Sequence, residues 1–346
     1  MKLSFPFALI ACALLPAVAF AQASLPSRKV VFTSNLRLSE SDIREMRQAA
    51  PSLNLVFPTR ENLSKELVDA EAVFGSVTRE QFLAAKKLRW MQITSAGVEN
   101  VLTGIPEIVQ SPVTVTNMKI VQGIEIADHA FALLLGLTRR IDVAVKDRES
   151  ETWRSLQQYG PPLELHGKTA VVVGVGGIGT QIAIRAKAFG MTVIGVDPKD
   201  LPYTPFLDRT VWPDRLDSVL PEADVVFISA PHTPQTDNLI KAAQFAKMKP
   251  GVLFIAVSRG KIYDNDALVA ALKSGHVAGA GLDVTATEPL PKGHPLWKTG
   301  RVILTPHIAG RSDGEGARYF ELYKDNLIRF SKGEPLRHVV DKEKGY

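Results

Sequence analysis

Short apolar segments alternate with longer amphipathic segments along the chain from about residue 28. The short segments predict strands and the amphipathic ones predict helices. A helix over residues 39–50 has Ser39 as its expected N-cap, with Asp42 three residues further on. Strands that alternate with helices form parallel sheets covered on both faces, so the pattern predicts an α/β protein. The strands are expected at residues 29–32, 53–57, 72–75, 90–93, 113–116, 169–174, 192–197, 224–229, 252–257, 278–284 and 302–305.

The longest helical pattern covers residues 124–148 and is apolar on most of its surface. Ala127, Phe131 and Leu134 lie on one stripe, and Leu133 and Leu137 widen it. A helix that is apolar on so many sides is buried on several sides. We therefore expect it between two domains or in a subunit interface, and we expect a homodimer that buries part of it. Further helices are expected at residues 179–189, 264–274 and 314–330.

Residues 174–179 form a G-x-G-x-x-G motif between a predicted strand and a predicted helix. This arrangement binds the pyrophosphate of a dinucleotide at the helix N-terminus. Gly174 permits the tight turn, Gly176 admits the pyrophosphate, and Gly179 lets the helix pack on the strand. A glycine turn that only packs tightly is the alternative interpretation. The candidate residues in the loop are Gly174, Gly176, Gly177, Ile178 and Gly179.

Asp197 ends the next predicted strand, at the position expected for the acidic ligand of the adenosine ribose. Its charge would repel a 2′-phosphate, so the sequence predicts NAD rather than NADP. Lys199 and Arg185 are close in sequence and weaken this preference.

Three polar residues each follow a predicted strand: Arg259, Glu288 and His307. Ligands of open α/β sheets bind at these strand ends. An arginine can bind a carboxylate through two hydrogen bonds, a histidine can transfer a proton near neutral pH, and a carboxylate can keep that histidine protonated. Taken singly, each has a simpler interpretation. Arg259 could form a surface ion pair, Glu288 could be a solvated loop residue, and His307 could be a partly buried histidine.

With these motifs in order, residues 29–344 resemble the D-isomer-specific 2-hydroxyacid dehydrogenases. The matching segments are residues 174–179, 231–236, 258–264, 279–290 and 305–310. The resemblance implies reversible hydride transfer between NAD and C2 of a D-2-hydroxy acid/2-oxo acid pair. It implies that Arg259 binds the substrate carboxylate and polarises the carbonyl, that His307 transfers the proton, and that Glu288 pairs with His307.

The resemblance implies further contacts to both ligands. The substrate carboxylate would lie on the backbone of Ser95, Ala96, Gly97 and Val98, beside Arg259. The cofactor would contact the phosphate loop, Asp197 and a second set of residues, with Asp283 at the carboxamide. That set is Pro231, Thr236, Val257, Ser258, Arg259, Asp283, His307 and Gly310.

The implied fold has two doubly wound parallel-sheet domains. A Rossmann cofactor domain, residues 121–306, is inserted in a flavodoxin-like substrate domain, residues 23–120 and 307–346. Two positions depart from the family pattern: Ala256 replaces a frequent asparagine, and Asp128 replaces the usual glutamate. Formate oxidation is disfavoured because that activity is associated with glutamine where Glu288 stands, whereas phosphite oxidation stays open. The alternatives from other classes are a corepressor-like protein that binds NAD without catalysis and an exported ligand-binding protein.

Composition excludes several classes of protein. Apolar residues make up 45% and charged residues 22%, which is typical of a folded soluble chain. The net charge of +5 comes from scattered residues, so no nucleic-acid partner is expected. Cys12 is the single cysteine, which excludes a disulfide framework and a cysteine-based zinc site. No metal site is expected.

The first 21 residues have the pattern of a secretory signal peptide: Lys2, an apolar stretch and Ala19-Phe20-Ala21. We expect cleavage after Ala21 and export to the periplasm or medium, with no membrane segment in the mature chain. An uncleaved anchor and a lipoprotein built on Cys12 are weaker alternatives. A cytoplasmic location is the alternative for the whole protein, because the NAD pool is there.

Overall fold

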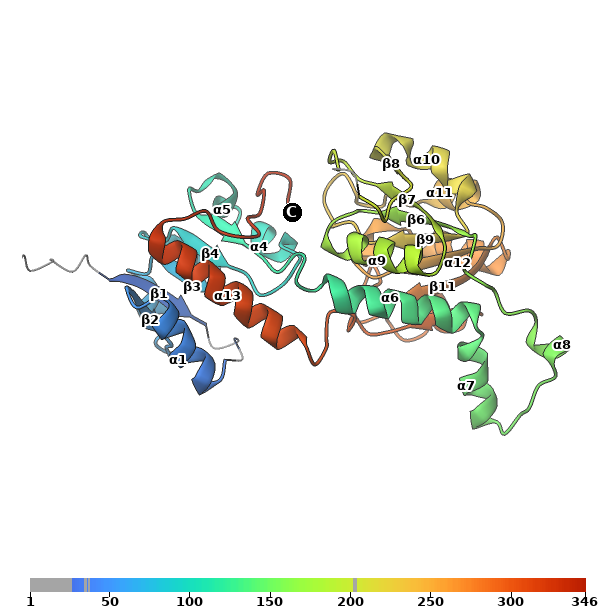
Figure 1. Cartoon of the computed structure of the whole chain (residues 1–346), viewed down its shortest axis with the longest axis horizontal. Coiled ribbons are helices and arrows are strands. Elements are labelled where there is room, and N and C mark those ends of the chain that lie inside the picture. Colours follow the sequence, from blue (N-terminus) through green and yellow to red (C-terminus); the bar gives the residue numbers. More distant parts are fainter. Residues whose placement is uncertain (1–26, 34–35, 37, 202–203) are drawn as a thin grey trace, which may run out of the picture.

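The computed structural model describes residues 27–346 except 34–35, 37 and 202–203. The signal segment predicted at residues 1–21 lies outside the described residues. The described part forms two α/β domains, each with its own parallel sheet (Figure 1). No helix among the described residues has both the length and the apolar character needed to cross a membrane.

The first domain has a five-stranded sheet of order β2-β1-β3-β4-β5, all parallel, as in flavodoxin-like folds. Ser39 caps the first helix and exchanges hydrogen bonds with Asp42, as the sequence predicts. The strands are β1 (Arg28–Phe32), β2 (Leu53–Val56), β3 (Ala72–Phe74), β4 (Trp90–Gln92) and β5 (Thr114–Thr116). The helices are α1 (Glu40–Ala49), α2 (Leu63–Leu67), α3 (Arg79–Ala84), α4 (Glu99–Gly104), α5 (Glu107–Gln110) and α13 (Glu315–Lys332).

The second domain has a seven-stranded parallel sheet of order β12-β11-β10-β9-β6-β7-β8. The order reverses between β6 and β9, and ligands bind at such switch points in open α/β sheets. Its strands are β6 (Thr169–Val173), β7 (Thr192–Val196), β8 (Arg209–Val211), β9 (Val225–Ile228), β10 (Val252–Ala256), β11 (Val277–Leu282) and β12 (Val302–Leu304). Its helices are α6 (Gly123–Thr138), α7 (Ile141–Glu149), α8 (Leu156–Tyr159), α9 (Gly177–Ala188), α10 (Leu216–Val219), α11 (Ala242–Lys247) and α12 (Asn265–Lys273).

The single helix predicted over residues 124–148 is wrong. Arg140 has φ = 61°, in the left-handed region, and separates α6 from α7. The broad apolar surface of α6 is buried within this chain: Phe131, Leu134 and Leu137 belong to the core beneath the seven-stranded sheet. α7 leaves the body of the domain as a projecting arm (Figure 1).

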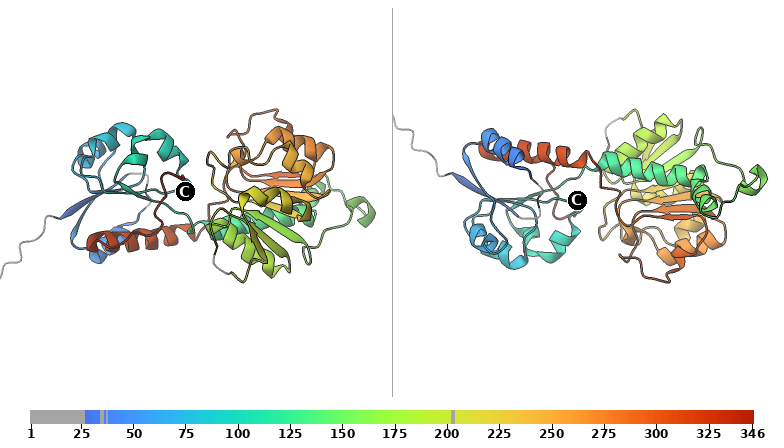
Figure 2. Two further views of the ribbon diagram at one scale, coloured as in Figure 1. Left: turned by 90° about the horizontal axis from the view of Figure 1, so that it is seen from above. Right: turned by 90° about the horizontal axis from the view of Figure 1, so that it is seen from below.

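The chain crosses between the domains twice, after β5 and before α13 (Figure 2). Met118 packs in the core of the first domain, whereas Ala127 packs in the core of the second. Ala309 also belongs to the core of the second domain, and Leu322 of α13 to that of the first. The residues after α13 then return along β5, where Val339 forms a bridge with Thr116.

Candidate active site

A cavity of about 910 Å³ lies between the two domains. The first domain contributes the loop after β4 and residues of α1 and α13. The second domain contributes residues of α6, the ends of β10 and β11 and the segment after β12. Most of the sequence-predicted residues at the nicotinamide and substrate end line this cavity. They are Ser95, Ala96, Gly97, Ile178, Val257, Arg259, Asp283, His307 and Gly310. The side chain of Val98 does not line the cavity, because it is 1% exposed and packs in the core of the first domain.

His307 and Glu288 form an imidazole–carboxylate pair. His307 Nδ1 lies 2.7 Å from Glu288 Oε2, and the Thr285 N–H donates to Glu288 Oε1 at 3.0 Å. His307 has φ = 53°, a strained backbone conformation that is found mainly where the surrounding structure fixes it. Both side chains are more than one-third exposed, and His307 lines the cavity. The pair therefore leaves His307 Nε2 as the ring nitrogen that can meet a substrate.

Asp283 holds the turn that presents His307. Its buried carboxylate accepts hydrogen bonds from Thr305 Oγ1 at 2.6 Å and from the N–H groups of Ile308 and Ala309 at 3.0 and 2.9 Å. Its backbone carbonyl accepts the His307 N–H at 2.9 Å. Asp283 also lines the cavity, and its contact with the nicotinamide carboxamide, which the resemblance implies, stays a prediction.

His129 on α6 supports the same turn, and the sequence reasoning missed it. Its Nε2 lies 2.8 Å from Thr305 Oγ1 and 3.5 Å from Asp283 Oδ1. The only available signal was its place in the Ala127-Asp128-His129 segment of the apolar helix.

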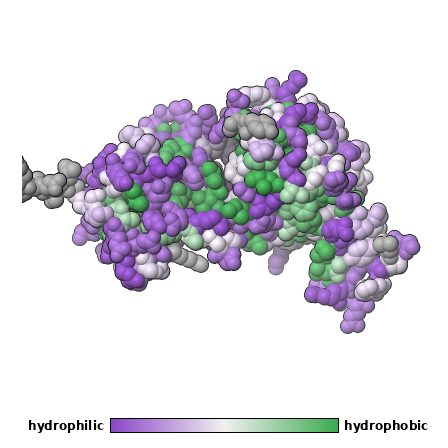
Figure 3. Space-filling model, in the orientation of Figure 1, coloured by the Kyte–Doolittle hydropathy of each residue, from purple (hydrophilic) through white to green (hydrophobic). Residues whose placement is uncertain are grey.

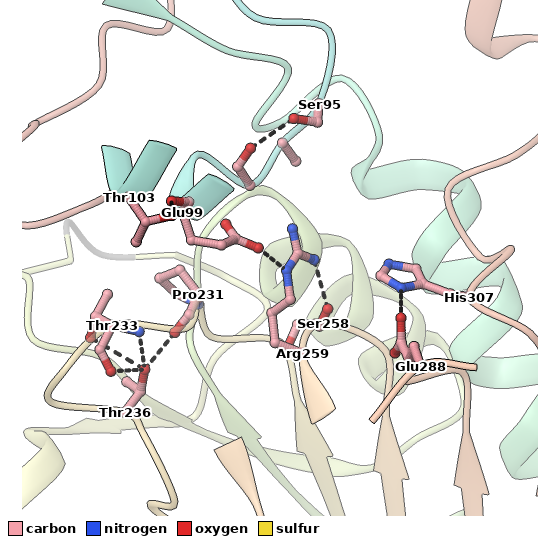
Figure 4. Close-up of polar contacts among 12 residues, drawn as sticks. Ser95, Glu99, Thr103, Pro231, Thr233, Thr236, Ser258, Arg259, Glu288 and His307 are labelled. Atoms are coloured by element: carbon pink, nitrogen blue, oxygen red, sulfur yellow. Dashed lines mark hydrogen bonds and ion pairs between the residues drawn. The ribbon is translucent and has the colours of Figure 1, made fainter. Parts of the chain in front are cut away.

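Arg259 lies on the same side of the cavity as His307, at the end of β10, and is fixed by two hydrogen bonds (Figure 4). Its Nη1 donates to the Ser258 carbonyl at 2.7 Å, and its Nε donates to Glu99 Oε1 of the first domain. A side chain at Gly97 would overlap the guanidinium, so the Gly97 backbone and Arg259 face each other closely. The remaining N–H groups of the guanidinium can meet a ligand.

Glu99 is the second functional candidate that the sequence reasoning missed. Burial alone would raise the pKa of Glu99. The charge and hydrogen bond of Arg259, with a smaller contribution from His232, lower this pKa by more than burial raises it. The net pKa of Glu99 is therefore below its ordinary value, so this carboxylate is ionised at neutral pH. It begins α4 directly after the predicted carboxylate-binding loop.

The loop of residues 95–98 is tied to the first crossing of the chain, after β5. Asn117 Nδ2 donates to the Ala96 carbonyl at 2.6 Å, and the Ala96 N–H donates to Gln122 Oε1 at 3.2 Å. Ser95 Oγ donates to the Gly97 carbonyl at 2.7 Å. The loop is thus shaped before a substrate arrives, and the Ala96 N–H is already occupied in this arrangement.

The phosphate loop has the geometry that a pyrophosphate needs. Gly174 has φ = 89°, and a side chain there would overlap the backbone of Ala230. A side chain at Gly176 would meet open space, and this glycine caps α9 without a side-chain hydrogen bond. Unpaired N–H groups at a helix N-terminus bind phosphate, so the loop fits the predicted dinucleotide.

The residues at the ribose end and at the nicotinamide end of the predicted site also fit a dinucleotide. Asp197 Oδ2 accepts the Val175 N–H at 2.8 Å and Oδ1 accepts the Lys199 N–H at 2.9 Å, which holds the carboxylate beside the phosphate loop. Arg185 points elsewhere and pairs with Asp128 on α6 at 2.6 Å. At the nicotinamide end, Ser258 Oγ is buried and has no hydrogen-bond partner among the described residues.

The loop after β9 is ordered by its threonines. Thr236 Oγ1 donates to the Pro231 carbonyl at 2.6 Å and accepts the Thr233 N–H at 2.8 Å (Figure 4). This loop follows the strand beside β6, so it lies next to the switch point. Among the described residues, no group of three or more histidine, cysteine, aspartate or glutamate side chains could hold a metal ion.

Residues 131–309 match the family model described as "D-isomer specific 2-hydroxyacid dehydrogenase, NAD binding domain". The chain belongs to this family. It is 34% identical over 295 residues to a glyoxylate reductase of Korarchaeum cryptofilum, covering 83% of this chain and 87% of that protein. The family and the site together make it an oxidoreductase of 2-hydroxy acid/2-oxo acid pairs with a nicotinamide dinucleotide cofactor.

Two further relatives show how widely the fold is shared. A D-3-phosphoglycerate dehydrogenase of Archaeoglobus fulgidus is 34% identical over 82% of this chain, which spans 54% of that longer protein. A solved D-isomer-specific 2-hydroxyacid dehydrogenase of Xanthobacter autotrophicus, in complex with NADPH and MES, superimposes with a TM-score of 0.78. Its sequence identity is 25%, and the match covers 92% of this chain and 100% of that chain.

Proposed function

We propose that the catalytic residues of this dehydrogenase are Arg259, Glu288 and His307, and that its substrates are small 2-oxo acids and the matching D-2-hydroxy acids. The observation that supports this assignment is the placement of the three groups. His307 and Arg259 line one cavity from the ends of nearby strands of one sheet, Glu288 pairs with His307 behind it, and the same domain carries a fitting dinucleotide loop.

Each residue has a distinct chemical task. A bound nicotinamide supplies the hydride for reduction and accepts it in oxidation. Arg259 binds the substrate carboxylate and stabilises the negative charge that develops on the carbonyl oxygen. His307 Nε2 donates a proton to that oxygen during reduction and removes it during oxidation. Glu288 holds Nδ1 and stabilises the imidazolium form.

The test of this assignment is reduction of a panel of 2-oxo acids that includes glyoxylate, followed by loss of NADH absorbance. His307→Ala removes the proton donor and is expected to lower kcat about 10²–10⁴-fold. NADH should still bind to this variant. Binding of NADH by the native chain without turnover of any oxo acid would favour the non-catalytic alternative.

We propose NAD rather than NADP as the preferred cofactor. Asp197 stands beside the phosphate loop, where a 2′-phosphate would meet its charge, and Arg185 is paired with Asp128 instead of being available for a phosphate. Asp197→Ala should narrow the difference in Kd between NADH and NADPH. Equal or tighter binding of NADPH to the native chain would contradict the proposal.

We propose that the protein forms a homodimer through the arm that contains α7 and the following loop. Ile141 and Val145 are 53% and 45% exposed, and Trp153 is 98% exposed. Figure 3 shows apolar surface on this arm, which projects from the domain. Large apolar side chains on an extended arm favour a covering partner, and a second copy of the chain is the partner we propose.

We also propose export, on the pattern of Lys2, the apolar stretch and Ala19-Phe20-Ala21. Mass spectrometry of the protein from its native host should show a mature N-terminus near Gln22. Recovery of a chain that retains Met1 in the cytosolic fraction would favour the cytoplasmic alternative.

A further inference from the structure

Residues 341–346, here called the tail loop, lie at the junction of the two domains (Figures 1 and 2). The loop is anchored on the first domain. The Val340 N–H donates to the Val115 carbonyl at 2.8 Å, and Lys342 Nζ donates to the carbonyls of Ser111 and Val113 at 2.6 and 2.9 Å. The tail loop is therefore a fixed extension of the β5 edge.

The tail loop also holds its own shape. The Asp341 carbonyl accepts the Gly345 N–H at 2.8 Å, and the Tyr346 carbonyl accepts the Asp341 N–H at 3.0 Å. Asp341 Oδ1 accepts the Lys344 N–H at 3.0 Å. A loop closed by these bonds presents the Tyr346 side chain in a defined place.

From this place the tail loop meets two loops of the cofactor domain. Lys199 Nζ lies 4.7 Å from the centre of the Tyr346 ring, a cation–π distance. A side chain at Gly345 would come within 3.9 Å of Thr233 Cγ2. Lys199 follows Asp197 at the end of β7, and Thr233 lies in the loop after β9.

These two loops flank the adenosine half of a dinucleotide bound in this domain. The pyrophosphate belongs at the N-terminus of α9, and the adenosine ribose at Asp197. The adenine then lies beyond the ribose, outside the carboxyl ends of β7 and β9. We propose that Tyr346 forms the outer wall of the adenosine pocket and contacts the adenine, so that the first domain contributes to binding of the adenosine half of the cofactor.

The contacts indicate that the tail loop borders the cofactor site and does not block it. Gly176 still faces open space, so the tail loop does not fill the phosphate end of the site. Both Asp197 carboxylate oxygens bond backbone N–H groups beside the phosphate loop, which leaves their other lone pairs for ribose hydroxyls. An aromatic ring that is held at the rim offers a stacking surface for a base at little entropic cost.

The inference rests on the proposed use of NAD, and the test separates the two. Kd values are measured by calorimetry for NADH, ADP-ribose and reduced nicotinamide mononucleotide with native protein, Tyr346→Ala and Tyr346→Phe. We expect Tyr346→Ala to weaken NADH and ADP-ribose about five- to tenfold, the range of one lost stacking contact, and to leave the mononucleotide unchanged. Tyr346→Phe keeps the ring and should bind within about twofold of native.

Two results would overturn the inference: an unchanged Kd for ADP-ribose in Tyr346→Ala, or a tighter one, which would make the tail loop an obstruction. Failure of the native protein to bind NADH would instead refute the proposed cofactor. A second measurement needs no variant. Photolabelling of the native protein with 8-azido-NAD should modify the peptide that contains Tyr346, in competition with ADP-ribose. Labelling confined to other peptides would contradict the proposed wall.

Discussion

At His307 the backbone and a carboxylate together decide where the imidazole points. The turn is held by Asp283, and the ring by Glu288, so two different carboxylates do two different tasks. One binds N–H groups of the backbone and fixes position. The other faces the ring and supplies negative charge at the nitrogen opposite the reacting one.

Glu288→Gln tests the second task. The variant keeps the shape and a hydrogen bond but loses the charge that stabilises the imidazolium. Because the protonated ring is the active form in reduction, the falling limb of the rate–pH profile for 2-oxo acid reduction should move to lower pH. Glu288→Asp keeps the charge as a control. A falling limb that stays in place, or moves to higher pH, would show that Glu288 is not the partner of His307.

Glu99 is predicted to position Arg259 from the other domain. Glu99→Ala leaves Nε without its charged partner, and loss of a hydrogen bond to a charged group should lower kcat/KM for a 2-oxo acid about tenfold. Glu99→Gln can still accept the hydrogen bond and should retain most of the activity. KM for NADH should stay unchanged in both, which separates positioning from general damage. Equal losses in the alanine and glutamine variants would assign the effect to charge alone.

The sequence could identify the residues whose place follows from a strand end or a motif. Arg259 and His307 each follow an apolar strand, and Asp197 completes a glycine motif, so local pattern and parallel topology suffice. Glu99 could not be found this way, because it pairs with a residue 160 positions away. The role of Asp283 was assigned by resemblance alone, and its bonds to the His307 turn depend on the crossing between domains.

At the scale of elements, the strands were predictable because buried parallel strands are continuously apolar. The edge strand β8 (Arg209–Val211) was missed, since its residues are mostly exposed and carry no such run. The break between α6 and α7 was missed because Arg139-Arg140-Ile141 contains neither glycine nor proline. Most of the apolar stripe of α6 is buried inside the chain, whereas Ile141, Val145 and Trp153 on the arm beyond the break are exposed.

The arm carries the prediction for assembly. Val145→Glu places a charge on the exposed face of α7 and should convert a dimer to a monomer in light scattering at micromolar concentration. Ile184→Glu is a control, because Ile184 is a similarly exposed apolar residue on α9 of the same domain. A native protein that is already monomeric would contradict the proposed dimer, as would a Val145→Glu variant that stays dimeric.

At the scale of the whole molecule, the chain returns along β5 of the first domain and leads to the tail loop, which meets the second domain at Lys199. His338 lies in this segment, and its carbonyl accepts the Asn117 N–H at 3.2 Å. Burial lowers the pKa of His338 most, and the charge of Lys119 lowers it further. The Asn117 backbone raises it by less, and the smaller effects of Arg337 and Asp325 have opposite signs. Its Nδ1 is buried without a hydrogen-bond partner among the described residues. The folded segment therefore favours the neutral ring.

This preference makes the docking of the segment dependent on pH. An unfolded histidine binds a proton near its ordinary pKa of 6.5, whereas the folded one does so only at lower pH. The stabilisation is thus complete above pH 6.5 and is lost progressively as pH falls toward the folded value. The protection factor of the Val340 amide against hydrogen exchange should fall between pH 7.5 and 5 in the native protein. His338→Asn tolerates the positive φ and has no titrating ring, so its protection should fall less over the same range. Parallel curves for the two proteins would show that His338 does not control the docking.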